Sequence, residues 1–305
     1  MHRAFEVTVL GTSSASPTKT RHPSAQFVRM EGDYFLLDCG EGTQLQMVRF
    51  GLRMHRIQYV LITHMHGDHF FGLPGLVTSM GLFGRTEPLT IAGPANLEAT
   101  LKTILESGDT RLPFDLDFIV CNPFVPEIII KNGGWQIESV PLKHRIDCTG
   151  YILRETGPEL KLNVKRCEEL SIPISAYESI KYGADYRLDD GHLIANHELT
   201  LPGNKNRSYA YISDTIYDEN VASFVSGVDL LYHESTFLHD LKKRALETFH
   251  TTAKEAGITA KNAGVKKLLV GHFSARYHTI EELTLEAREV FPNTEAAEEG
   301  KTYQV

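Results

Sequence analysis

The chain of 305 residues has few cysteines, a single tryptophan and no long apolar run. Its four cysteines are widely separated and form no Cys-x-x-Cys pair, which argues against both a disulfide framework and a thiolate zinc site. No stretch approaches the ~20 apolar residues that a membrane-spanning helix needs. The first residues also lack the apolar core of a secretory signal. These absences predict a cytoplasmic protein with no membrane partner.

Positive charge is scarce as well, because 31 lysines and arginines face 39 aspartates and glutamates, for a net charge of −8. Indiscriminate nucleic-acid binding usually rests on a large positive field, so this balance argues against it. It does not exclude a nucleic-acid substrate, since bound divalent cations would make a carboxylate-lined site locally positive. With 42% hydrophobic residues, the chain is long enough to fill a sizeable core.

A dense set of metal-binding side chains follows one apolar segment. Residues 59–62 are aromatic, β-branched or aliphatic and predict a buried strand, and the sequence His64-x-His66-x-Asp68-His69 comes just after it. Imidazoles and a carboxylate together suit zinc or manganese. A histidine-rich surface turn is the alternative, but three imidazoles and one carboxylate at this spacing favour one edge of a metal site.

Strands and helices alternate along the rest of the chain, which predicts an α/β fold. One segment breaks the pattern: residues 154–188 are poor in strand signals and contain Gly157-Pro158, Pro173 and mixed charges. We interpret it as an arm inserted into a single domain of residues 1–305. The predicted strands cover residues 5–10, 24–30, 34–37, 59–62, 89–93, 128–130, 135–142, 208–213, 229–232 and 266–270, and the main helices lie near residues 45–52, 73–82, 96–106 and 279–290.

Further metal-binding residue types recur where predicted strands end. An α/β fold would gather such residues at one rim of its sheets, where loops carry the chemistry. The residues in question are His64, His144, Asp214, Glu234 and His272.

These donors support the hypothesis of a two-metal site. Two metals ~3.5–4 Å apart can activate a hydroxide and stabilise the leaving group of a phosphodiester, and Asp68 could also orient the attacking water. Taken singly, His144 or His272 could be a hydrogen-bonded loop histidine and Asp214 a helix cap. In the hypothesis, His64, His66 and His144 hold one metal, Asp68, His69 and His272 hold the other, and Asp214 bridges them.

The motif His64-x-His66-x-Asp68-His69 resembles that of the metallo-β-lactamase superfamily. Residues 70–75, 233–237, 250–253 and 271–277 bring the resemblance closer to the ribonuclease Z family of tRNA 3′-processing endoribonucleases, and it extends over nearly the whole chain. The resemblance implies a four-layer αβ/βα sandwich, two zinc ions per subunit with Mn²⁺ or another divalent metal as alternatives, a homodimer, and precursor tRNA as substrate.

The resemblance also implies catalytic and substrate-binding residues. His250, held by Glu234, would protonate the leaving 3′ oxygen and would act with Asp68. The alternative is that His250 opens or caps a helix beginning at Thr251 and that Glu234 bonds a backbone turn. Arg276 is predicted to meet a phosphate, with a surface salt bridge as the alternative, and Ser274 in the same block is predicted to bind substrate.

The predicted arm matches the family least well. Its six basic residues in 154–188 are balanced by six acidic ones, Glu159 included, and no Gly-Pro pair lies near Pro173. A solvated mixed-charge insertion is therefore the alternative to a tRNA-binding arm.

The sequence as a whole predicts a zinc-dependent endoribonuclease that removes the 3′ trailer from precursor tRNA by metal-hydroxide attack and leaves a 3′ hydroxyl on the tRNA. The alternatives are a superfamily phosphodiesterase acting on a small or cyclic nucleotide, and a non-cleaving metal-dependent RNA-binding protein. Asp38 is predicted to orient its loop rather than to touch a metal.

Overall fold

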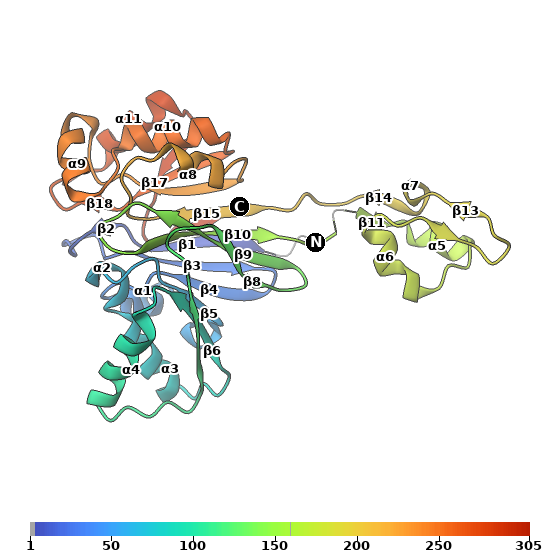
Figure 1. The fold of residues 1–305 in the computed structure, drawn as a ribbon, viewed down its shortest axis with the longest axis horizontal. Coiled ribbons are helices and arrows are strands. Elements are labelled where there is room, and N and C mark those ends of the chain that lie inside the picture. Colours follow the sequence, from blue (N-terminus) through green and yellow to red (C-terminus); the bar gives the residue numbers. More distant parts are fainter. Residues whose placement is uncertain (1–3, 159) are drawn as a thin grey trace.

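The computed structural model describes residues 4–158 and 160–305. Residues 1–3, part of the segment judged to lack a secretory signal, and Glu159 of the predicted arm lie outside the described residues. Two seven-stranded sheets lie face to face, and a layer of helices covers the outer face of each (Figure 1). The predicted αβ/βα sandwich is confirmed.

The first sheet carries three helices on its outer face: α1 (Thr43–Arg49), α3 (Leu73–Leu82) and α4 (Leu97–Ser107). Leu36 and Ile91 of the sheet share one buried cluster with Leu76 and Leu101 of the helices. The strands from β4 to β7 are parallel. In spatial order the sheet runs β20 (Thr302–Gln304), β1 (Phe5–Gly11), β3 (Ala25–Met30), β4 (Asp33–Leu37), β5 (Tyr59–Leu61), β6 (Leu89–Gly93) and β7 (Leu116–Val120).

The second sheet is covered by α8 (Glu219–Phe224), α10 (Ala253–Ala263) and α11 (Glu281–Val290), which share a second cluster with it. The strands from β15 to β19 are parallel. In spatial order the sheet runs β19 (Thr294–Ala296), β17 (Lys267–Gly271), β16 (Leu230–Glu234), β15 (Ser208–Ile212), β10 (Cys148–Glu155), β9 (Trp135–Leu142) and β8 (Glu127–Lys131).

Aromatic side chains fill the space between the sheets. The only tryptophan, Trp135, is fully buried there, with its ring centroid 5.0 Å from that of Phe35 and 5.2 Å from that of Tyr59 in edge-on arrangements. Such pairs prefer edge-to-face geometry because the ring edge is positive and the face negative. The packing fixes the two sheets against each other, and with them the loops at their edges.

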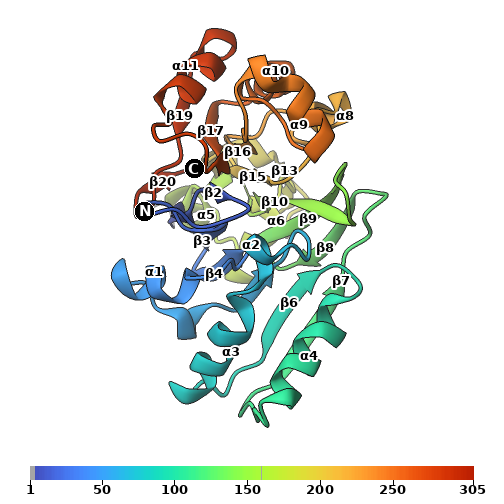
Figure 2. The ribbon, with the colours of Figure 1, turned by 90° about the vertical axis from the view of Figure 1, so that its left-hand side faces the viewer.

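One edge of the sandwich collects the ends of five strands. The chain leaves β5, β9, β15, β16 and β17 at this edge, which also bears the short helix α2 (Gly67–Phe70) and faces the viewer in Figure 2. The parallel strands share a direction, so residues that follow them are brought side by side.

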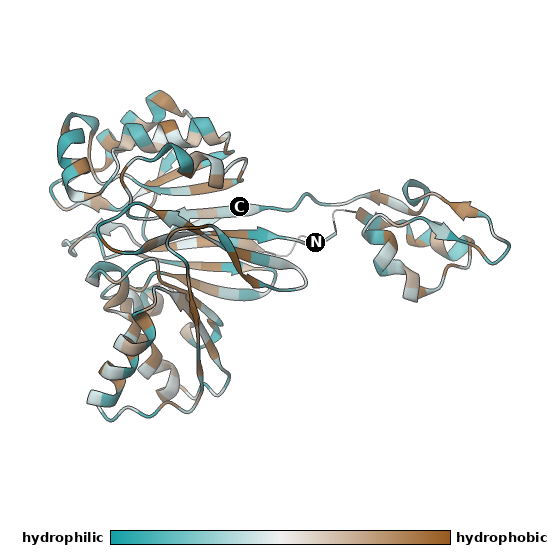
Figure 3. Cartoon of the chain, in the orientation of Figure 1, coloured by the Kyte–Doolittle hydropathy of each residue, from teal (hydrophilic) through white to brown (hydrophobic). Residues whose placement is uncertain are grey.

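The segment between β10 and β15 stands away from the sandwich as an arm, at the end opposite α2 (Figure 1). It continues beyond the predicted boundary at Leu188, because Ile194 and Leu199 complete a small buried cluster with Cys167, Ile172 and Ile180. Figure 3 shows apolar residues among hydrophilic ones in this arm. Its elements are β11 (Leu160–Leu162), α5 (Val164–Glu169), α6 (Tyr177–Lys181), β12 (Tyr186–Arg187), β13 (Leu193–Ile194), α7 (Asn196–Leu199) and β14 (Thr200–Pro202).

Within residues 4–158 and 160–305, every helix is too short or too polar to cross a membrane.

Candidate metal centre

One group of metal-binding atoms forms where β5, β9 and β15 end. The Nδ1 of His66 lies 3.0 Å from the Nε2 of His64 and 3.1 Å from the Nε2 of His144. The Oδ2 of Asp214 lies 3.7 Å from the Nε2 of His64 and 3.8 Å from that of His144. One donor atom from each of these four residues therefore faces a common point, and all four lie within 4.8 Å of one another.

The second group lies on the other side of Asp214. The Nε2 atoms of His69 and His272 lie 3.4 Å and 3.5 Å from the Oδ2 of Asp68. The same two nitrogens lie 3.4 Å and 3.2 Å from the Oδ1 of Asp214. Asp214 thus turns one oxygen to each group, which is the arrangement expected of a bridging carboxylate.

The outward ring nitrogens of four histidines are held by other parts of the protein. Because one nitrogen of each ring is held by a hydrogen bond, the other nitrogen is directed toward the centre. Outer partners of metal-binding histidines orient their rings in the same way. The Nδ1 of His69 contacts the Oδ2 of Asp38 at 2.7 Å, that of His144 the carbonyl of Phe249 at 3.0 Å, that of His272 the hydroxyl of Thr236 at 3.0 Å and that of His64 the hydroxyl of Thr63 at 3.0 Å.

Most protonation states suit ligands; the exception is His69, where burial opposes the charged form but the carboxylates of Asp214 and Asp68 outweigh it and raise the pKa. Burial lowers the pKa of His64 and of His144, so both imidazoles are neutral at neutral pH. Burial opposes ionisation of Asp214, but the imidazoles of His272 and His69 outweigh it and hold the pKa of its carboxyl below the ordinary value. The same balance, led by His69, holds the pKa of Asp68 low. Neutral imidazoles and ionised carboxylates are the forms that bind metals.

The donor set fits divalent cations. The Nε2 of His69 is buried and has no hydrogen-bond partner among the described residues, although it points at two carboxylates. A buried polar atom of this kind usually has a partner, and a cation between these residues would supply it. A set made only of imidazole and carboxylate atoms is one that zinc and manganese accept.

The cavity at this centre has a volume of about 460 Å³.

Named relatives align with this chain over nearly their whole length. Ribonuclease Z of Porphyromonas gingivalis is 42% identical over 97% of this chain and 97% of its own length. Ribonuclease Z of Parabacteroides distasonis is 38% identical over 99% of each chain. This chain belongs to the ribonuclease Z family. The resemblance carried by its motifs is thereby confirmed.

Other comparisons agree on the fold. Human tRNase Z, short form, superposes with a TM-score of 0.71 at 25% identity and covers 98% of this chain and 99% of its own. The metallo-β-lactamase fold protein YhfI of Bacillus subtilis reaches a TM-score of 0.70 at 21% identity over 99% and 100%. A family model described as Anti-Pycsar protein Apyc1 matches residues 5–197, more than half of the chain, so that family also includes this chain.

His250 and Glu234 lie together beside the centre of this ribonuclease Z family member. The Nδ1 of His250 is 3.0 Å from the Oε1 of Glu234, which is fully buried and also accepts the backbone N–H of Thr251 at 2.9 Å. The alternative that His250 caps a helix is wrong, because Thr252 caps α10 and forms a capping box with Glu255.

Asp214 is likewise no helix cap, since the side chain of Asp218 caps α8. The two residues predicted to bind substrate, Arg276 and Ser274, line the cavity at the metal centre. The guanidinium of Arg276 lies 4.9 Å over the ring of Phe237, and its Nε donates to the Ser274 hydroxyl at 3.3 Å. No carboxylate among residues 4–158 and 160–305 pairs with Arg276, so the surface salt bridge considered for it is absent there.

Sequence reasoning missed two other arginines, Arg145 and Arg244, that reach the same cavity. Arg145 directly follows His144, and this adjacency was the only signal available. Sequence reasoning also missed how many groups Asp38 holds by hydrogen bonds. Asp38 lies at the end of β4 with a φ of 54°, and besides His69 it accepts the backbone N–H of Thr63 at 2.8 Å and the hydroxyl of Tyr211 at 2.9 Å.

We expect Asp38→Asn to weaken metal binding by about 10- to 100-fold, the usual cost of losing an outer partner of a ligand. The amide keeps the volume of the side chain but loses the charge that holds the ring of His69. Competition with a chromogenic chelator measures the affinity, and Asp117→Asn on the exposed side of β7 is the matched control. Equal affinities for both variants would contradict a role for Asp38 in orienting His69.

Proposed function

We propose that this chain is a divalent-metal-dependent endoribonuclease of the cytoplasm that removes the 3′ trailer from precursor tRNA and leaves a 3′ hydroxyl on the tRNA. One observation carries the proposal: Asp214 turns one carboxylate oxygen toward each of two adjoining groups of ligand atoms, and both groups lie beside a His250–Glu234 pair. The extent and names of the relatives, ribonuclease Z, support it.

The proposed metals are two zinc ions per subunit, with Mn²⁺ or another divalent ion as alternatives. When bound, such a pair activates a water and neutralises charge on the phosphodiester. The proposed ligands are His64, His66 and His144 for one ion, Asp68, His69 and His272 for the other, and Asp214 for both.

Asp68 is placed to orient a water in the cavity. Its Oδ2 accepts the backbone N–H of Ala15 at 2.7 Å, which fixes the carboxylate from the segment between β1 and β3. Because Asp68 lines the cavity, its carboxylate can take part in positioning the attacking water there.

His250 is placed to supply the proton. Burial alone would lower its pKa, but the carboxylates of Glu234 and Asp214 outweigh burial and raise the pKa to about 9. The ring is therefore protonated at neutral pH, with Nδ1 held by Glu234 at 3.0 Å, and Nε2, which has no hydrogen-bond partner among the described residues, would donate to the leaving 3′ oxygen. Glu234 would keep the ring oriented throughout.

The function is tested by comparing kcat/KM for a precursor tRNA with a 3′ trailer and for a cyclic nucleotide, using metal-loaded protein. We expect the tRNA to be cleaved and the cyclic nucleotide to react far more slowly. The opposite preference would establish the alternative of a small-molecule phosphodiesterase. Tight binding of the tRNA without cleavage would establish the non-cleaving RNA-binding protein.

We propose that the arm binds the body of the tRNA. The eight residues of β10 separate the arm from the edge of the sandwich that bears the metal centre. They span roughly 27 Å at ~3.4 Å per residue, so the arm reaches parts of the substrate far from the cut. The arm has a hydrophobic cluster of its own, separate from those of the sandwich, which supports an arm that is itself packed and can present a binding surface.

Removing the arm should raise KM for precursor tRNA by roughly 10²-fold or more, because one of two linked contact sites is lost. Residues 157–205 can be replaced by a short Gly-Ser linker, since the backbone N–H of Glu155 already donates to the carbonyl of Arg207 at 3.0 Å. Hydrolysis of bis(p-nitrophenyl) phosphate should be unchanged. Parallel losses on both substrates would show that the arm only supports the fold.

We propose that the chain forms a homodimer through the outer surface of α1 and α3. These helices adjoin, with the Gln44 amide donating to the Ser79 hydroxyl at 2.5 Å. Several large apolar side chains are exposed on or beside them, among them Leu45 at 72%, Val48 at 65% and Phe71 at 68%. Clustered exposed apolar side chains often mark an interface.

The double variant Leu45→Asp with Val48→Asp should be a monomer in sedimentation velocity at concentrations where the parent protein is a dimer. Two carboxylates cannot be buried unpaired in such an interface. Leu285→Asp on α11, a site that is 57% exposed, is the control and should remain dimeric. A dimeric double variant would place the interface elsewhere.

A further inference from the structure

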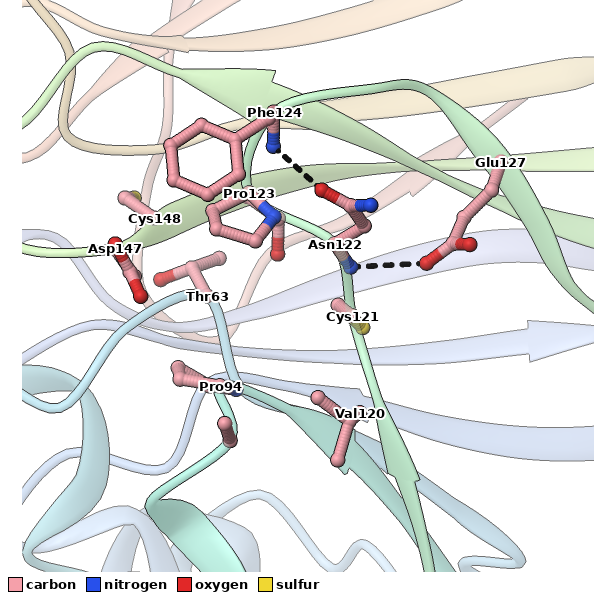
Figure 4. Close-up of a pocket in the computed structure, with 12 residues that line it drawn as sticks. Thr63, Pro94, Val120, Cys121, Asn122, Pro123, Phe124, Glu127, Asp147 and Cys148 are labelled. Atoms are coloured by element: carbon pink, nitrogen blue, oxygen red, sulfur yellow. Dashed lines mark hydrogen bonds between the residues drawn. The ribbon is translucent and has the colours of Figure 1, made fainter.

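A path leads away from the metal centre along the loop between β9 and β10. His144 and Arg145 line the cavity of the metal centre and also a second cavity of about 460 Å³. Phe124 and Cys148 line that second cavity and also a third, of about 450 Å³, which Thr63 lines as well (Figure 4). Because each cavity shares lining residues with the next, the three lie side by side and mark a path along the surface from the reactive groups.

The ring of Phe124 overlooks this path from the loop between β7 and β8. Its side chain is 79% exposed, although the loop that bears it is held in place. The backbone N–H of Phe124 donates to the Asn122 side chain, and that of Asn122 donates to Glu127, both at 2.9 Å (Figure 4). An aromatic ring that is exposed on a fixed loop can serve as a stacking platform for a nucleic-acid base. Such stacking depends little on which base is present.

Charge changes along the path. Arg145 is exposed beside the metal centre, and no carboxylate among the described residues pairs with it, whereas the neighbouring Lys143 pairs with Asp218 at 3.1 Å. Farther along, none of the described residues that line the third cavity is basic, and two of them, Glu127 and Asp147, are acidic. A phosphate is therefore favoured only near Arg145, and the far part suits a neutral, flat group whose amino hydrogens can be donated to a carboxylate.

We propose that this path binds one unpaired nucleotide of the RNA strand next to the scissile phosphate, with its phosphate at Arg145 and its base stacked on Phe124. The inference rests on the proposed function, because it names a part of the same substrate. It explains why an exposed phenylalanine stands on a fixed loop within a path that begins at the metal ligand His144.

The test is a double-mutant cycle between protein and RNA. Parent protein and Phe124→Ala are each assayed on a precursor tRNA and on versions that carry one abasic nucleotide, placed in turn at each unpaired position around the cut. Phe124→Ala should lower kcat/KM on the intact precursor by roughly 5- to 150-fold, the usual effect of losing one base stack. At one abasic position the same substitution should have no further effect, because the stack is already gone.

Three controls accompany the cycle. Phe124→Trp should restore activity, Leu285→Ala at an exposed apolar residue of α11 should leave it unchanged, and bis(p-nitrophenyl) phosphate should be hydrolysed equally by parent and Phe124→Ala. If Phe124→Ala lowers kcat/KM by the same factor at every abasic position, or has no effect at all, this inference is overturned while the proposed function stands. If the parent protein does not cleave the precursor, the proposed function fails and this inference fails with it.

Discussion

Replacing Asp214 with alanine should lower kcat on precursor tRNA by more than about 10³-fold and should deplete the protein of metal. The loss exceeds the ~10- to 100-fold cost of removing an outer partner because Asp214 places one oxygen toward each group of ligand atoms. Four imidazoles of the proposed ligands face its side chain at 3.8 Å or less, those of His64, His69, His144 and His272. Without Asp214, these imidazoles lack the carboxylate that links the two proposed metal sites.

Elemental analysis of the purified variant gives the metal content, and single-turnover cleavage gives the rate. Asp240→Asn, at an exposed carboxylate in the same part of the chain, is the control. Near-UV circular dichroism shows whether the variant keeps its packing around Trp135. A folded Asp214→Ala protein with full metal content and parental kcat would rule out the bridging role.

His250→Ala should lower kcat on precursor tRNA by about 10²- to 10⁴-fold, the range for a general acid, and should have little effect on bis(p-nitrophenyl) phosphate. A 3′ alkoxide needs a proton to leave, whereas p-nitrophenolate is stable without one. The variant should keep its metal, because neither proposed set of ligands includes His250.

The competing possibility for His250 is that it is a ligand, since its ring lies near Asp214 and His272. In that case the variant would lose metal and would fail equally on both substrates. His278→Ala, at an exposed histidine, should behave as the parent protein on both.

The ligand positions could be predicted because two simple patterns coincide. Apolar runs with strand character place the ends of β5, β9, β15 and β17 within a residue or two, and the residues after them are donors. The fold gathers the strand ends at one edge, so His64, His144, Asp214 and His272 meet although they are far apart in the sequence. Their individual roles as ligands remain predictions.

Other features could not be read from the sequence because they depend on partners distant in the chain. β20 pairs with β1 from the other end of the molecule, and Thr302–Gln304 has no pattern of its own. The arm continues past Leu188 because β14 pairs back with β11, with Thr200 opposite Leu162. Asp38 looks like a loop residue until the fold brings His69 against it.

Analysis of the two RNA ends made by the metal-loaded protein tests the central claim most directly. Mass spectrometry of the products of a precursor tRNA should show a 3′ hydroxyl on the tRNA and a 5′ phosphate on the released trailer. A chelator should abolish the products, and added zinc should restore them. A 2′,3′-cyclic phosphate on the tRNA, or cleavage that persists in the chelator, would contradict a metal-dependent hydrolysis at this centre.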